Sequence, residues 1–117
     1  MRASEQRVAR AQFTTAIVDR EPVDDITVVS PPVDSVFFFT DLRHMEGRTV
    51  IHRWEYAGRV QSQKPFQVKG PRWRVYSQVV LEPEQYGDWS VTVLDESGWP
   101  LYVEIFRYEP GANRPRR

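Results

Sequence analysis

Two histidines and a glutamate are the residues of this chain that could bind a transition metal. His44 and Glu46 lie close to His52, so two imidazoles and a carboxylate fall within nine positions. His44 is predicted in a turn and His52 within a strand, and their spacing matches no established ligand set. The chain contains no cysteine, which excludes thiolate metal sites, disulfides and cysteine nucleophiles. We therefore expect His52 to be a neutral, hydrogen-bonded core residue, and we expect no metal site.

A second group of potential ligands is the acidic connection formed by Asp19, Glu21, Asp24 and Asp25. Carboxylate oxygens are the ligands that calcium prefers, but the ligand spacing of an EF-hand loop and its glycine are missing here. Pro22 also stiffens the segment. The ordinary interpretation is an acidic turn, and we expect no cofactor.

Hydrolysis would need a serine or threonine activated by a histidine and an orienting acid. Ser77 and His52 both belong to sets of residues predicted to face inward, so the two could meet. A serine in a packed layer cannot receive a substrate, and the chain has neither a nucleophile-elbow motif nor a glycine-rich phosphate loop. We predict no catalytic residue, and a hydrolase is the third-ranked hypothesis.

The elements that must position these residues are short strands separated by turns. Glycine, proline and charged residues interrupt apolar segments at intervals of about 8–12 residues, and no convincing helical periodicity occurs between them. This pattern predicts an all-β fold, an immunoglobulin-like antiparallel sandwich of seven to eight strands. The expected strands are residues 13–18, 26–29, 36–42, 49–56, 60–68, 72–81, 88–94 and 101–108.

Period-two alternation assigns three tryptophans to the core. Successive side chains of a strand point to opposite faces, and Trp54 shares a face with Val50 and His52. Trp73 falls on the same face as nearby valines, and so does Trp89. We therefore predict a structural core that includes His52 and the three tryptophans.

The residues that alternate with these tryptophans form the candidate interaction surface. Arginine outnumbers lysine 14 to 2 in the chain, and the guanidinium group suits interfaces because it binds carboxylates bidentately and stacks on aromatic rings. The alternative is an exposed ladder of cross-strand pairs that serves the sheet alone. Trp99, in a Gly-Trp-Pro turn, is the tryptophan expected to be exposed. The candidate surface comprises Arg53, Glu55, Arg72, Arg74, Tyr76 and Trp99.

Charge and length define the domain organisation. The chain has 117 residues, enough for one domain, and its net charge of zero hides a basic N-terminus, a basic C-terminus and an acidic body. We expect a flexible basic arm or linker remnant at 1–10, a single sandwich domain at 11–110 and a basic disordered tail at 111–117. The acidic body would repel phosphate backbones, so no nucleic acid partner is expected. No apolar run is long enough to span a membrane.

Five segments carry a family resemblance. They are Phe-Thr-Thr-Ala-Ile with Arg-Glu-Pro-Val-Asp (13–24), Phe-Phe-Thr-Asp-Leu (38–42), His-Arg-Trp-Glu-Tyr (52–56), Gly-Pro-Arg-Trp-Arg-Val-Tyr-Ser (70–77) and Gly-Asp-Trp-Ser-Val-Thr-Val (87–93). In this order, over residues 11–108, the chain resembles a bacterial domain of unknown function, the family numbered 2914. The resemblance implies a β-rich module that is often appended to proteins with membrane segments. It implies no catalytic residues.

Together these observations predict a non-catalytic interaction or accessory domain of a bacterial, membrane-associated protein. Its partner would be another protein or an appended membrane domain, and its envelope association would depend on a membrane segment outside this chain. The alternative is a sandwich that binds a small ligand or a carbohydrate, because such domains stack sugars on exposed aromatic side chains.

Overall fold

The protein is all-β in its computed structural model, which describes residues 5–111. Within that range it has ten strands and no α-helix. The strands are β1 (Arg7–Thr14), β2 (Ile17–Val18), β3 (Glu21–Pro22), β4 (Val28–Val29), β5 (Ser35–Arg43), β6 (Thr49–Tyr56), β7 (Arg59–Gln67), β8 (Arg72–Val80), β9 (Gly87–Asp95) and β10 (Pro100–Tyr108).

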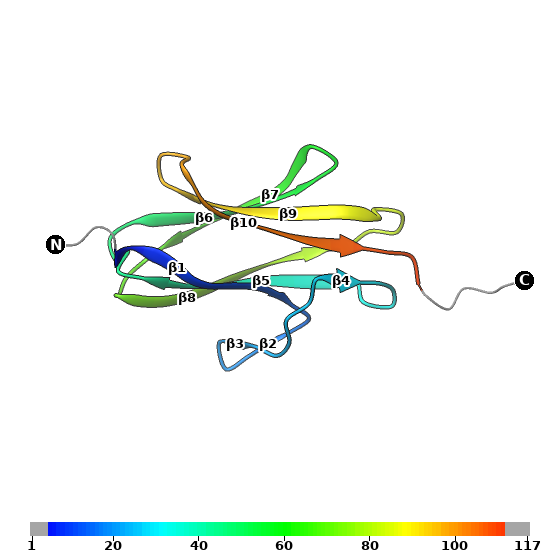
Figure 1. The fold of residues 1–117 in the computed structure, drawn as a ribbon, viewed down its shortest axis with the longest axis horizontal. Coiled ribbons are helices and arrows are strands. Elements are labelled where there is room, and N and C mark those ends of the chain that lie inside the picture. Colours follow the sequence, from blue (N-terminus) through cyan, green and yellow to red (C-terminus); the bar gives the residue numbers. More distant parts are fainter. Residues whose placement is uncertain (1–4, 112–117) are drawn as a thin grey trace, which may run out of the picture.

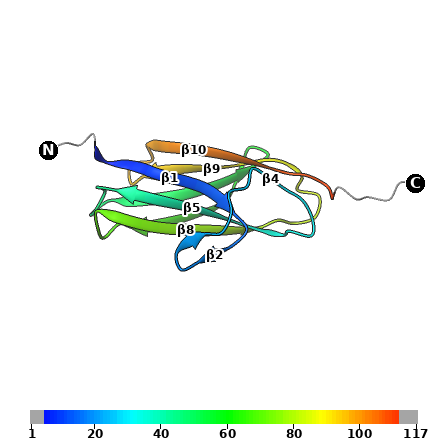
Figure 2. The same cartoon turned by 60° about the horizontal axis from the view of Figure 1, so that its bottom comes forward.

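Two sheets make up the body of the molecule (Figure 1). One has the order β1-β5-β8 and the other the order β4-β10-β9-β6-β7. All pairs are antiparallel except β4 with β10, which is parallel. The two sheets lie face to face, and β1 lies beside β10 along one side (Figure 2). The small β2–β3 hairpin lies on the outer side of the three-stranded sheet (Figure 1).

The all-β prediction is confirmed, whereas the expected number of strands was too low. The predicted strand 13–18 is interrupted at residues 15 and 16, because β1 ends at Thr14 and Ile17–Val18 forms the separate strand β2. β3 lies where a charged connection was expected, and it pairs with β2 in a hairpin. Asp19 and Arg20 form its turn with positive φ angles of 54° and 65°. Elements this short carry no readable period of side-chain alternation, which is why the sequence pattern missed them.

The predicted N-terminal arm is wrong for residues 7–10, because β1 begins at Arg7 and pairs with β5. The register shifts between Val8 and Arg10, so the strand contains a bulge that breaks strict alternation. Val8 and Ala11 consequently both pack against the core although they are three positions apart. The bulge interrupts the period of two in this segment, which explains why the alternation pattern predicted no strand there. Residues 1–4 and 112–117 lie outside the described residues.

The core lies between the two sheets and is built around aromatic rings. Phe13 of β1 packs against Phe38 and Phe106, with ring centroids 4.9 and 4.7 Å apart, and its centroid lies 5.9 Å from that of Trp54. All four side chains are buried. Because they come from both sheets, burial of these rings holds the layers together and stabilises the fold by several kcal/mol per ring, at about 25 cal/mol per Å².

The two ends of the sandwich are formed by different connections (Figure 1). At one end lie the start of β1, the β5–β6 loop and the β9–β10 turn. At the other end lie the β4–β5 and β8–β9 connections and the end of β10. Each end carries a distinct set of polar and aromatic residues.

Candidate functional site

The structure does not bring the predicted arginine-rich surface together. Arg53 and Glu55 lie on the outer face of the five-stranded sheet, because the alternate residues of β6 are buried in the core. Arg72, Arg74 and Tyr76 lie on the outer face of the three-stranded sheet. The predicted surface is therefore divided between opposite sides of the molecule. Strand alternation separates inside from outside, but it cannot say which strands share a sheet.

Several of these arginines are engaged in contacts within the sheets. Arg74 forms an ion pair with Glu21 of the β2–β3 hairpin, and Glu21 also accepts a hydrogen bond from Arg10 at 3.2 Å. The contact with Arg74, followed by that with Arg10, lowers the pKa of the Glu21 carboxyl. Arg53 pairs with Glu55 at 3.7 Å and donates to Gln63 at 3.2 Å. Of these contacts, only that of Arg53 with Gln63 joins opposite residues of neighbouring strands, as in the cross-strand ladder that was the alternative to an interaction surface.

The predicted core residues lie inside, with one exception. His52, Trp54 and Trp89 are buried, whereas Trp73 is only partly buried and packs against the edge of the core. Trp73 belongs to β8, which is an edge strand of its sheet. Within residues 5–111 no strand pairs with the free edge of β8, so Trp73 contacts the core without being fully buried.

His52 is the centre of a buried polar network. One ring nitrogen, Nε2, lies 3.0 Å from the Thr40 hydroxyl, and Nδ1 lies 2.8 Å from the Ser77 hydroxyl. The Trp54 indole N–H donates to the same Ser77 oxygen at 2.9 Å. Burial lowers the pKa of His52 to about 3, so the ring is neutral at pH 7.

The predicted meeting of Ser77 and His52 thus occurs, but its chemistry is that of a packed core. The second ring nitrogen of His52 contacts a hydroxyl group rather than the carboxylate that orients a catalytic histidine. Ser77 is buried, and its oxygen accepts the Trp54 N–H. The arrangement satisfies polar groups that would be costly to bury alone.

The two groups of potential metal ligands considered from the sequence lie in different surroundings. His44 lies in the β5–β6 loop, whereas His52 is enclosed in the core. In the acidic connection, Asp24 accepts hydrogen bonds from the hydroxyls of Thr14 and Thr15, both at 2.6 Å. Within residues 5–111 no group of three or more histidine, aspartate or glutamate side chains is placed to hold a metal ion.

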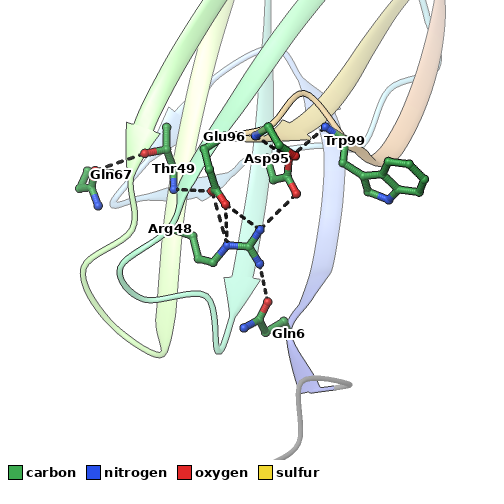
Figure 3. Close-up of polar contacts among 8 residues, drawn as sticks. Gln6, Arg48, Thr49, Gln67, Asp95, Glu96 and Trp99 are labelled. Carbon is green, nitrogen blue, oxygen red and sulfur yellow. Dashed lines mark hydrogen bonds and ion pairs between the residues drawn. The ribbon is translucent and has the colours of Figure 1, made fainter.

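Trp99 lies on a turn that fixes its backbone and leaves its ring in solvent (Figure 3). Asp95 Oδ1 accepts hydrogen bonds from the Ser97 N–H and hydroxyl at 2.9 and 2.7 Å, and from the Trp99 N–H at 2.9 Å. The Asp95 N–H donates to the Trp99 carbonyl at 3.0 Å. Gly98 provides the positive φ of 85° that the turn requires. The Trp99 residue is 68% exposed.

Hydrogen bonds from Ser97 and from the Trp99 N–H lower the pKa of the Asp95 carboxyl. The carboxylate is therefore ionised at neutral pH, and its second oxygen lies 3.1 Å from the Arg48 guanidinium. Arg48 also contacts Glu96 at 3.0 Å and donates to the Gln6 side chain at 2.6 Å (Figure 3). The hydrogen bond with Glu96 raises the pKa of Arg48, and that with Arg48 lowers the pKa of Glu96.

Arg48 thereby ties three segments together at this end of the sandwich. Gln6 lies next to β1, Arg48 is in the β5–β6 loop, and the two carboxylates belong to the β9–β10 turn. We call Gln6, Arg48, Asp95, Glu96 and Trp99 the Trp99 cluster. Arg48 pairs with both carboxylates, and the indole of Trp99 extends into solvent beside them.

A cavity of about 340 Å³ lies at the same end. Its apolar lining includes Val8, Met45 and Leu101, and Tyr102 and Arg48 contribute polar groups. The Tyr102 hydroxyl donates to Glu104 at 2.7 Å. A concave apolar surface with a few placed polar groups is typical of binding sites. The arrangement can therefore bind a partner or a small ligand.

Sequence reasoning found Trp99 and missed the residues that hold it. Asp95 and Glu96 were predicted only as a loop, although an aspartate followed by serine and glycine is typical of a turn in which the carboxylate accepts backbone N–H groups. That signal could have identified Asp95. Arg48 is far from Asp95 in sequence, and no local pattern pairs them.

The fold defines a class of protein: a two-layered all-β module whose apolar core encloses a hydrogen-bonded polar network. The chain belongs to the family described as "Protein of unknown function (DUF2914)", whose model matches residues 47–108. This match confirms the family resemblance, and it covers β6 to β10. No curated protein matches the chain. Residues 5–111 contain no helix that could cross a membrane.

Proposed function

We propose that this chain is a non-catalytic interaction module of a bacterial, membrane-associated protein, and that it binds a protein partner through the Trp99 cluster. The bacterial and envelope-associated setting follows from what the family resemblance implies. Within the all-β class we propose an immunoglobulin-like sandwich, supported by the face-to-face packing of two mainly antiparallel sheets.

The observation that carries the proposal is the exposed ring of Trp99 on a hydrogen-bonded turn. A tryptophan can bury 150–250 Å² on contact with a partner, and tryptophan is enriched among the residues that dominate binding energy. Because the Trp99 backbone is held by Asp95, little additional ordering of the turn is required on binding. A preorganised anchor loses less entropy on association.

The surrounding surface supports the same function. Tyr102 and Val103 are 39% and 53% exposed, and both follow Trp99 along β10. Aromatic residues and arginine are the types enriched in interfaces, and Arg48 lies at the base of this turn.

The experiment compares three proteins in affinity purification from cells of the source bacterium, with bound proteins quantified by mass spectrometry. Trp99→Ala is expected to weaken recovery of the partner at least about 30-fold, the effect of losing about 2 kcal/mol of binding free energy. Val60→Ala is the matched control, because Val60 is 51% exposed and lies on β7. Equal recovery with both variants would overturn the proposal.

Carbohydrate binding is the second candidate, and one observation favours it: Trp99 in the β9–β10 turn and Tyr102 near the start of β10 are both exposed aromatic residues. Exposed rings can stack on sugars, and Trp99 would then report binding through its fluorescence. A glycan panel should change the emission of the wild-type protein and leave Trp99→Ala unchanged. A panel without any change would exclude this candidate.

A further inference from the structure

A second cavity, of about 430 Å³, lies at the end of the sandwich opposite the Trp99 cluster. It is formed by the β4–β5 and β8–β9 connections and the end of β10 (Figure 2). Much of its lining is apolar and includes Pro31, Pro32, Pro83 and Leu81. Its volume is in the range of small-ligand sites.

The charged residues that line this cavity are both acidic. Asp34 belongs to the β4–β5 connection and Glu82 to the β8–β9 connection, so the carboxylates come from two separate segments. Both residues are exposed, and neither carboxylate forms an ion pair within residues 5–111. The cavity therefore combines an apolar wall with negative charge at its rim.

Tyr108 provides an independent sign that the cavity accepts a ligand. The residue is only 4% exposed, and its hydroxyl makes no hydrogen bond within residues 5–111. Every fully enclosed side-chain nitrogen or oxygen in that range has a partner. The Tyr108 hydroxyl must therefore be the part of the side chain that opens on the cavity. A buried tyrosine normally has a hydrogen-bond partner, and here the position of that partner is open to a ligand.

The hydroxyl remains protonated and has lone pairs to offer. Burial raises the pKa of Tyr108, and Tyr86 and Asp34 raise it further. Asp34 and Tyr108 both line the cavity. Carboxylate and hydroxyl oxygens that converge on one space are acceptors for a group rich in N–H donors.

The aromatic wall is rigid. The rings of Tyr86 and Tyr108 have centroids 4.8 Å apart and are tilted by 37°. The Tyr86 carbonyl accepts a hydrogen bond from the Tyr56 hydroxyl at 2.9 Å, and the Gln85 carbonyl accepts one from the Trp89 indole at 3.0 Å. Two core aromatics thus fix the segment that carries Tyr86, so its ring is positioned before any ligand arrives.

We propose that this cavity binds an organic cation, a guanidinium or alkylammonium group with an apolar body. The apolar body would contact the prolines, and the cationic head would lie against the tyrosine rings and donate hydrogen bonds to Tyr108, Asp34 and Glu82. Attraction between a cation and an aromatic face contributes about 0.5–2 kcal/mol, and charge-assisted hydrogen bonds add to it. This site is separate from the Trp99 cluster and does not depend on the function proposed for it.

The test is a titration with butylguanidinium, followed by two-dimensional NMR of the ¹⁵N-labelled protein. Butylurea is the neutral control of similar shape. Butylguanidinium should shift the amide signals of residues 81–86 and 107–111 in a saturable manner, and butylurea should not. Shifts scattered over the surface, or equal shifts with both compounds, would overturn the proposal.

Two double variants separate a built site from general charge attraction. Asp34→Asn with Glu82→Gln should weaken butylguanidinium binding at least tenfold. Asp19→Asn with Glu46→Gln removes the same charge from exposed positions elsewhere and should bind as the wild type does. Tyr108→Phe deletes only the hydroxyl and should weaken binding several-fold. Equal affinity in the two double variants would contradict the assignment.

The natural source of the cation is distinguished by a second probe. N-acetylarginine amide carries the same head group within a peptide-like backbone. Tighter binding of this compound than of butylguanidinium would assign the site to an arginine side chain of a protein, and weaker binding would assign it to a free amine or guanidine. Failure of both compounds to bind would overturn the proposal of a cation site. It would not affect the proposal that the Trp99 cluster binds a protein partner.

Discussion

Trp54 and Trp99 are both held by hydrogen bonds, but the bonds act on different parts of the residue. The Trp54 indole N–H donates to Ser77, and the ring is fully buried between the sheets. At Trp99 the backbone N–H and carbonyl are bonded to Asp95, and the residue is 68% exposed. One tryptophan is fixed by its side chain and the other by its main chain.

This difference shows how a polar network decides the role of an aromatic residue. Around Trp54 the network of His52, Thr40 and Ser77 uses the donors and acceptors of the side chains, so the groups close on one another. Around Trp99 the network fixes the backbone conformation and leaves the indole to contact other molecules. The first arrangement stabilises the fold, and the second presents a side chain.

The largest expected effect is the loss of stability on replacing Trp54. Trp54→Ala should lower the free energy of unfolding by about 3–5 kcal/mol, because it leaves a cavity between the sheets and deprives Ser77 of a donor. Urea denaturation followed by circular dichroism measures the change.

Trp73→Ala is the matched control for Trp54→Ala, because Trp73 is only partly buried at the sheet edge. Trp73→Ala should lower the free energy of unfolding clearly less than Trp54→Ala does. Equal costs for the two substitutions would show that burial does not separate these tryptophans as the structure indicates.

The roles of the tryptophans could be predicted from local alternation, whereas their partners could not. The pattern around Trp54 and Trp89 indicated which side faces inward, and an exposed Trp99 followed from its turn. The assignment of Arg53 and Arg74 to one surface failed because β6 and β8 lie in different sheets. Sheet order depends on which strands pair over long sequence separations, and alternation within a strand carries no information on that. The contact of Arg48 with Asp95 could not be predicted either, because the two residues are far apart in the sequence.

As the pH falls, the stability contributed by the network around Trp54 should be lost before that contributed by the Trp99 turn. The pKa of His52 is lowered to about 3 in the folded protein, whereas an unfolded histidine titrates near 6.5. Its contribution to stability is therefore complete above pH 6.5 and is lost as the pH falls toward 3, since only the unfolded chain takes up the proton. Between pH 7.5 and 5 the free energy of unfolding should fall by about 2 kcal/mol.

Denaturation of the wild type and of His52→Gln at several pH values measures this effect. The range above pH 5 avoids the carboxyl groups of Asp95 and Glu96, whose pKa values are lowered. If the free energy of unfolding of His52→Gln depends on pH as strongly as that of the wild type, His52 is not the group that causes the pH dependence.

A smaller effect on stability, and a larger one on local order, is expected from Asp95. Asp95→Ala removes the acceptor for the Ser97 and Trp99 N–H groups, so the turn should become mobile. The ¹⁵N order parameter at Trp99 should fall from about 0.85 to below about 0.6. Asp95→Asn retains the acceptor oxygen and loses only the charge that faces Arg48. It should keep the turn ordered, and a mobile turn in this variant would assign the order to the ion pair instead.

The smallest effect on stability is expected at Trp99 itself. Trp99→Ala removes a ring that is mostly in solvent and keeps the backbone hydrogen bonds. The free energy of unfolding should therefore change by no more than about 0.5 kcal/mol. Thermal melting of this variant beside Trp54→Ala then separates the two roles most directly. A loss of more than about 2 kcal/mol would mean that the Trp99 ring supports the fold, and the contrast between a closed and a presenting network would fail. Unchanged melting together with lost partner binding would establish that the indole is displayed for recognition, because the substitution removes only the ring, which makes no hydrogen bond within residues 5–111.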